Sequence, residues 1–227
     1  MTISIIIPCY NQQEYITTAI ASALDQTVPC EIIFINDGST DNSLEIAKSF
    51  ENKGVRIVNQ VNKGLASARN TGIMWVTGDF VLPIDADDIL LENCVEKIIE
   101  AIKSNPDADI ISPSFKCFGL LQDEIILMEN PTIEDFKTGN RVGYCSAIRR
   151  DVLLEVGGYN PKMIEGYEDL ALNCLLLSKG KKLITIPEIL WLYRVKVESM
   201  ITKITPEIHK KLIAQINKDV PSANLNF

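Results

Sequence analysis

Short apolar runs alternate with amphipathic stretches in the first half of the chain. The runs are rich in β-branched residues and lie at 3–7, 31–35, 55–58 and 80–84. In the gaps between them, apolar residues recur three and four positions apart, as on one face of a helix. Strands that alternate with helices build βαβ units with parallel strands. Residues 1–105 therefore predict an α/β fold with a mainly parallel sheet.

The pattern changes after about residue 105. Apolar runs separated by shorter polar connections predict further strands at 108–112, 125–128, 142–148 and 183–186. Between the last two, residues 167–179 predict a nearly all-apolar helix that begins with Glu168 and Asp169 and stops at Gly180. Residues 106–200 are thus predicted to be a mixed α+β half.

The chain shows no internal repeat, no low-complexity linker and no clear boundary before about residue 200. We therefore expect one domain over residues 1–200 and a helical tail over 201–227. The tail holds one amphipathic stretch, with apolar positions at Ile208, Leu212, Ile213 and Ile216. We expect this stretch to dock on its own domain, with a partner protein as the alternative.

Composition narrows the classes of function. The 227 residues are 46% hydrophobic and 23% charged, as in a chain that buries a large core. The net charge of -8 disfavours a nucleic-acid partner, which needs a basic surface. The single histidine, His209, leaves almost nothing for histidine zinc sites or Ser-His-Asp triads, so acid–base chemistry must use carboxylates.

The expected location is the cytoplasm. The six cysteines form no C-x-x-C pair and are scattered through apolar runs, as reduced buried thiols are. The apolar run at 3–7 is too short for a membrane span or a signal peptide and stops at Pro8. We expect no transmembrane segment, and at most peripheral contact with the inner face of the membrane.

Polar clusters follow three of the predicted parallel strands, at 8–11, 36–39 and 85–88. Ligands of open α/β sheets bind outside the carboxyl ends of the strands, so these clusters should converge on one rim. Asp85 and Asp87, two positions apart on an extended chain, would face the same side and could share a divalent cation. The alternative is a solvated turn and helix cap.

Two more segments could contact a nucleotide. Asp37 could accept hydrogen bonds from a base or ribose, and Tyr10 offers a flat face for stacking. Asp37 could equally belong to an ordinary Asp-Gly-Ser turn. Lys63 and Arg69 lie beside small residues at a helix start, as a phosphate or base site needs, although a surface helix packed closely at Gly72 would look the same.

These segments, in this order, resemble the nucleotide-binding half of family 2 glycosyltransferases. Gly157-Gly158-Tyr159, Gly166-Tyr167-Glu168-Asp169 and Tyr193-Arg194 resemble the acceptor half, so the likeness covers roughly residues 3–200. It implies a GT-A fold, with a Rossmann-like parallel sheet merged with the mixed half. It also implies an inverting mechanism, a nucleotide-diphosphate sugar donor and Mn(II) or Mg(II).

The resemblance also implies a role for each matching residue. The nucleoside pocket would be formed by Pro8, Tyr10, Asp37 and Arg69, with Lys63 and Gly64 lining it and with Asp37 and Arg69 reading the base. Asp85 would approach the ribose or the metal, Asp87 would ligate the metal, and Asp169 would be the catalytic base. UDP-sugars are the expected donors, and a saccharide or lipid-linked saccharide of bacterial surface polysaccharide or glycolipid synthesis is the expected acceptor.

The chain departs from the family at two places. Many relatives carry a histidine two positions after the Tyr-Arg pair, where this chain has Lys196. A metal ligand would then be missing, and our hypothesis is that the Lys196 ammonium contacts the diphosphate, the alternative being an exposed lysine. Leu170-Ala171 replaces an aromatic and an acid, which should alter acceptor choice, and residues 115–130 match nothing interpretable.

Other functions fit less well. A nucleotide-sugar pyrophosphorylase would need a glycine-rich basic loop after the first strand, and a dinucleotide-dependent oxidoreductase would need G-x-G-x-x-G there. The sequence has Pro8-Cys9-Tyr10-Asn11 instead. A degenerate homologue that binds nucleotide sugar without turnover stays open because of Lys196.

Overall fold

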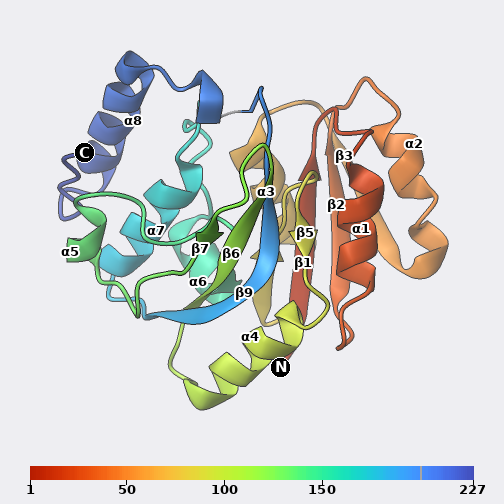
Figure 1. The fold of residues 1–227 in the computed structure, drawn as a ribbon, viewed down its shortest axis with the longest axis horizontal. Helices are drawn as coiled ribbons and strands as arrows, with labels where there is room; N and C mark the ends of the chain where they lie inside the picture. Colours follow the sequence, from red (N-terminus) through yellow and green to blue (C-terminus); the bar gives the residue numbers. More distant parts are fainter. Residues whose placement is uncertain (200) are drawn as a thin grey trace.

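One continuous sheet of nine strands runs through the computed structural model, which describes residues 1–199 and 201–227 (Figure 1). The strand order is β3-β2-β1-β4-β8-β6-β9-β5, and β7 pairs with β6 off this path. The strands are β1 (Ile3–Cys9), β2 (Glu31–Asp37), β3 (Val55–Gln60), β4 (Phe80–Pro83), β5 (Ile89–Leu90), β6 (Ile110–Gly119), β7 (Glu124–Ile125), β8 (Ala147–Arg149) and β9 (Leu183–Val195).

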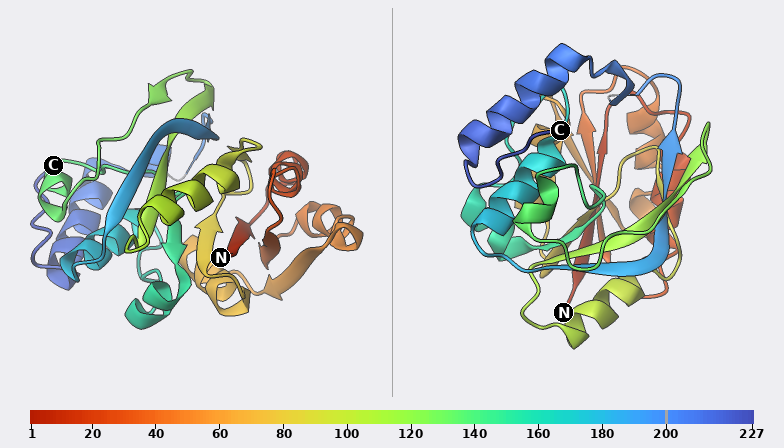
Figure 2. Two further views of the ribbon diagram at one scale, coloured as in Figure 1. Left: turned by 90° about the horizontal axis from the view of Figure 1, so that it is seen from below. Right: turned by 60° about the vertical axis from the view of Figure 1, so that its left-hand side comes forward.

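Helices pack on this sheet and connect its strands (Figures 1 and 2). They are α1 (Ile16–Leu24), α2 (Ser43–Lys48), α3 (Leu65–Trp75), α4 (Cys94–Ser104), α5 (Ile133–Phe136), α6 (Arg150–Val156), α7 (Glu168–Ser178) and α8 (Pro206–Asp219), with 3-10 turns at Glu51–Lys53 and Ile201–Lys203. No helix in the described ranges is long and apolar enough to cross a membrane.

The first half has the predicted parallel arrangement. Strand β1 pairs in parallel with both β2 and β4, and β2 pairs in parallel with β3. All seven residues of β1 are buried, which explains its nearly continuous apolar sequence. Because the strands are parallel, their carboxyl ends lie at one edge of the sheet.

The second half is mixed, as predicted, but its strands differ in extent. β8 is antiparallel to β4 and β6, whereas β9 runs parallel to β6 and continues to Val195, well beyond the expected 183–186. Pairing with β6 sustains this length, through register shifts on both sides of Ser114. β5 was not predicted, because its two residues are a strand only through pairing with β9.

The expected strand at 142–148 is wrong over most of its length, because only Ala147 and Ile148 lie in β8. The preceding residues turn back, with the Ser146 N–H donating to the Tyr144 carbonyl. A Cβ on Gly143 would lie 2.6 Å from Cζ2 of Trp191, so this turn is packed directly against the indole. The expected strand at 125–128 is likewise reduced to Glu124–Ile125.

The two faces of the sheet carry separate apolar clusters. Ile3, Ile5 and Ile7 pack with α1 and α4, whereas Ile6 packs with α3 and with the helices of the second half. Leu212, Ile213 and Ile216 of α8 are buried in the second cluster. The tail helix therefore docks on its own domain, on the side where α7 lies (Figures 1 and 2).

Helix α3 approaches β1 very closely at Gly72. A Cβ at this position would lie 2.9 Å from Cγ2 of Ile6 and 3.0 Å from Cδ1 of Ile35. Ile6 is central in the sheet and has little freedom to move. The close helix packing considered from the sequence is therefore present at Gly72.

Gly72→Ala should destabilise the protein. The added methyl overpacks the core at a cost toward the upper end of the typical ~1–3 kcal/mol, against a gain of ~1 kcal/mol in helix propensity, so we expect a net loss of up to about 2 kcal/mol. Urea unfolding measures the loss. Met74→Ala, on the exposed side of the same helix, should stay within about 0.5 kcal/mol, and equal effects of the two variants would contradict the packing account.

Candidate active site

A cavity of about 930 Å³ opens at the carboxyl ends of β1, β2 and β4 and extends to the start of α7 and the end of β9. The predicted site residues that line it are Pro8, Tyr10, Asp37, Gly64, Arg69, Asp85, Asp87, Asp169 and Lys196. Lys63 is the exception, since its side chain is exposed and only its backbone contacts a site residue. The convergence of the polar clusters on one rim is confirmed.

Asp37 organises the loop between β3 and α3. Its carboxylate is almost fully buried and accepts hydrogen bonds from Nε2 of Gln60 at 2.7 Å and from the backbone N–H groups of Lys63 and Gly64, each at 2.9 Å. Gly64 has a φ of 85°, a conformation that glycine adopts without strain. Across the rim, Tyr10 leaves nearly half of its surface open to the cavity.

Arg69 joins the two halves of the cavity. Its guanidinium is 1% exposed and donates to Oδ1 of Asp85 at 2.8 Å and to Oε1 of Glu168 at 2.5 Å. The rings of Tyr144 and Tyr159 lie 5.0 and 5.3 Å from it. The structure thus places Arg69 between two carboxylates. That Arg69 also contacts the nucleobase of the donor stays a prediction.

The carboxyl group of Asp85 is a weaker acid than that of an ordinary aspartate. Burial raises its pKa to about 6, although the Arg69 guanidinium lowers it, and the nearby Asp87 carboxylate raises it further. Desolvation of the charged form therefore outweighs the ion pair.

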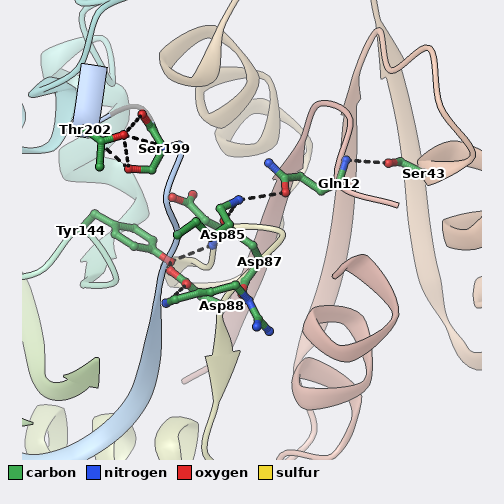
Figure 3. A network of polar contacts seen from close by, with 10 residues as sticks. Gln12, Ser43, Asp85, Asp87, Asp88, Tyr144, Ser199 and Thr202 are labelled. Atoms are coloured by element: carbon green, nitrogen blue, oxygen red, sulfur yellow. Dashed lines mark hydrogen bonds and ion pairs between the residues drawn. The ribbon is translucent and has the colours of Figure 1, made fainter. Parts of the chain in front are cut away.

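Asp87 forms an ion pair with Lys196. The Lys196 ammonium lies 2.5 Å from Oδ2 of Asp87 and 3.3 Å from Oε1 of Gln12, over the face of Tyr15. Both members of the pair are about one-fifth exposed. Gln12 and Asp87 belong to the same network of polar contacts in Figure 3. The residue that replaces the family's histidine is therefore held against the predicted metal ligand.

A hydrogen-bonded frame below the cavity fixes the acidic turn (Figure 3). The Tyr144 hydroxyl accepts from the Asp85 N–H at 3.0 Å and donates to Asp88. Asp88 is buried and also accepts from the Arg194 N–H at 2.7 Å, while Nε of Arg194 donates to the Asp87 carbonyl at 2.8 Å. Sequence reasoning missed these roles of Tyr144 and Asp88. Tyr144 lay inside a wrongly expected strand, so no sequence signal marked it.

Asp169 lies in the first turn of α7 and lines the same cavity. Its carboxylate accepts from Nδ2 of Asn140 at 3.3 Å. Burial raises the pKa of this carboxyl above its ordinary value, although the Arg69 guanidinium and backbone N–H groups lower it. The N–H groups of a helix start favour the ionised form and would alone make Asp169 a weaker base, but burial outweighs them. Asn140 was not predicted as a site residue.

The carboxylates present fit a resident divalent cation poorly. No group of three or more His, Cys, Asp or Glu side chains in the described ranges could hold a metal ion. Asp85 and Asp87, the predicted ligands, each already face a cationic side chain. The Mn(II) or Mg(II) expected from the resemblance stays a prediction for this chain.

The sequence is similar to that of known glycosyltransferases. "Glycosyltransferase GlyG" of Streptococcus pneumoniae serotype 4 is 39% identical over 113 residues, which are 48% of this chain and 37% of that protein. The chain thus matches little more than a third of this relative's length.

Two solved structures share the fold. Staphylococcus aureus TarS in complex with UDP-GlcNAc matches with a TM-score of 0.83 at 19% identity, covering 100% of this chain and 68% of that one. The mannosyltransferase PcManGT of Pyrobaculum calidifontis, solved with GDP-Man and Mn²⁺, matches with a TM-score of 0.68 at 17% identity, covering 97% and 72%.

The family model described as Glycosyl transferase family 2 matches residues 4–157. This range includes the carboxyl ends of β1, β2 and β4, where the cavity opens. That match spans more than half of the chain and agrees with the GT-A fold of the solved neighbours. The chain therefore belongs to glycosyl transferase family 2.

Proposed function

We propose that this chain transfers a sugar from a nucleotide-diphosphate donor, most simply a UDP-sugar, to an acceptor hydroxyl with inversion. The observation that carries the proposal is that Tyr10, Asp37, Asp87 and Asp169 all line the same cavity. It offers a nucleoside pocket, a charged diphosphate region and a base. The TarS neighbour, which holds UDP-GlcNAc, supports the choice of UDP-sugar.

The nucleoside would lie between Tyr10 and Asp37. A carboxylate has about four acceptor positions, and Asp37 uses three of them on Gln60, Lys63 and Gly64. One position is left for an N–H of the base or a hydroxyl of the ribose. The open ring of Tyr10 gives a surface on which a flat base can stack.

The diphosphate would lie beside Asp87 and Lys196. Negative charge grows on the diphosphate as its bond to the anomeric carbon breaks, so a positive charge is needed there. A divalent cation on Asp87, expected from the resemblance, is one source, and the Lys196 ammonium is the other. Asp85 keeps its proposed place beside the ribose, with its orientation set by Arg69.

Asp169 would act as the base. The acceptor oxygen attacks the anomeric carbon, the bond to the diphosphate oxygen breaks, and the acceptor proton passes to Asp169. Inversion requires the base and the leaving group on opposite faces of the sugar. The raised pKa makes Asp169 a better proton acceptor than an ordinary aspartate.

The acceptor is proposed to be a saccharide or lipid-linked saccharide at the cytoplasmic face of the membrane, for surface polysaccharide or glycolipid synthesis. This part of the proposal rests on the family resemblance alone. The Asp87–Lys196 pair also keeps a second candidate open, a homologue that binds nucleotide sugar without turnover.

Asp169→Asn should lower kcat for UDP-GlcNAc transfer or hydrolysis by about 10²- to 10⁴-fold, because the base is lost. UDP affinity, measured by calorimetry, should be unchanged. Asp151→Asn is the matched control, since Asp151 also lies in the first turn of a helix but does not line the cavity. Wild-type UDP binding without turnover, or an Asp169→Asn variant with full activity, would contradict the proposed role.

The activity should rise with pH along its acid limb, because Asp169 must be ionised to accept a proton. Since its pKa is raised from 3.8, the midpoint of this limb should lie above pH 3.8. The Asn140 amide stabilises the ionised form, so Asn140→Ala should move the limb to still higher pH. The kcat–pH profiles of both proteins measure this, and a shift to lower pH in Asn140→Ala would count against Asp169 as the titrating group.

Arg69→Met should destabilise the fold by about 3–5 kcal/mol, because Asp85 and Glu168 would lose their buried counter-ion. Adding Glu168→Gln should recover part of the loss by removing one stranded charge. Arg56→Met breaks the more exposed pair with Glu31 and should cost at most about 1 kcal/mol. Urea unfolding of the four proteins tests the difference, and similar losses for Arg69→Met and Arg56→Met would refute it.

A further inference from the structure

We propose that the Lys196 ammonium, and not a divalent cation, is the positive charge that receives the donor diphosphate in this chain. The inference rests on the proposed function, because it assumes that a nucleotide-diphosphate sugar occupies the cavity. It assigns a specific task to the residue at which the sequence departs from its family.

Lys196 is held in place by its surroundings. It follows Val195, the last residue of β9, and the preceding Arg194 is tied to the acidic turn through Asp87 and Asp88. The ammonium contacts Oδ2 of Asp87 and Oε1 of Gln12. The Gln12 backbone is itself anchored, because its N–H donates to Oγ of Ser43 at 2.9 Å (Figure 3).

One donor of the ammonium remains for a ligand. An ammonium has three N–H donors, and the described contacts of Lys196 use two of them, on Asp87 and Gln12. Lys196 lines the same cavity as Tyr10 and Asp37, so a nucleotide held there would direct its phosphates toward this region. Lysine is a common phosphate partner because it is a compact positive charge with freely rotating donors.

The same contact disfavours a metal. A divalent cation bound to Asp87 would lie beside an ammonium that is 2.5 Å from one of the carboxylate oxygens, and like charges repel strongly in a partly buried site. The other predicted ligand, Asp85, already binds the buried Arg69. Among the described residues, no third His, Cys, Asp or Glu side chain completes a metal-binding group with these two carboxylates.

The test compares binding of UDP, by calorimetry, with binding of uridine, by NMR, in excess EDTA and in Mn²⁺. Wild type should bind UDP in EDTA, and Mn²⁺ should add little. Lys196→Met keeps the length of the side chain but removes its charge, and should weaken UDP binding by about 10- to 100-fold while leaving uridine binding unchanged. Lys103→Met is the control, since Lys103 is an exposed lysine of α4 that does not line the cavity, and it should bind UDP like wild type.

Lys196→His tests the metal directly. The imidazole would remove the fixed positive charge and add a metal ligand beside Asp87. We expect this variant to bind Mn²⁺ without nucleotide, seen by electron paramagnetic resonance, and to bind UDP in a Mn²⁺-dependent way. Wild type should show neither property.

The outcomes separate the two proposals. If UDP binds only with Mn²⁺, or if Lys196→Met binds UDP like wild type, the lysine proposal is wrong while the nucleotide site stands. If neither UDP nor uridine binds under any condition, the proposed UDP-sugar donor is wrong and the inference falls with it. Equal losses in Lys196→Met and Lys103→Met would show a general charge effect and would also overturn the inference.

Discussion

The buried guanidinium of Arg69 is the interaction on which the rest of the site depends. It comes from α3 in the first half of the chain and binds Asp85 after β4 and Glu168 at the start of α7. Arg69 and Glu168 are thereby removed from bulk water and Asp85 largely so, which is tolerable only because each is paired. The pairing sets the place of Asp169, because Asp169 follows Glu168 directly. Arg69 thus links the part of the cavity proposed to hold the nucleotide sugar to the part that holds the proposed catalytic base, Asp169.

The sheet supplies the frame for this link. β1 is buried on both faces and pairs with β2 and β4, so the segments after these strands emerge side by side. Two segments at this edge are then held by polar contacts: Asp37 holds the loop between β3 and α3, and Tyr144 with Asp88 holds the acidic turn after β4. The apolar core therefore decides where the loops leave the sheet, and buried hydrogen bonds decide their shape.

Sequence reasoning succeeded where one physical signal dominates. The apolar runs of β1, β2 and β4 are almost entirely buried, and because these strands are parallel, the polar residues that follow them meet at one edge of the sheet. It failed where structure depends on distant pairing. The two residues of β5 and the extension of β9 to Val195 exist only through their partners. The roles of Tyr144 and Asp88 arise from contacts 56 residues apart in the chain, which no local pattern records.

The balance of charge in the cavity explains which carboxylate is left for chemistry. Asp37 is satisfied by three N–H donors, Asp85 and Glu168 share Arg69, and Asp87 faces Lys196. Asp169 has only the neutral amide of Asn140 as a side-chain partner among the described contacts. Burial raises the pKa of Asp169, and no direct ion pair among the described residues opposes it, although the Arg69 guanidinium and backbone N–H groups lower the pKa. The ion pairs in the cavity therefore do more than stabilise the fold: they engage Asp85, Glu168 and Asp87 with cationic side chains and leave Asp169 as the carboxylate that the proposed mechanism uses to receive the acceptor proton.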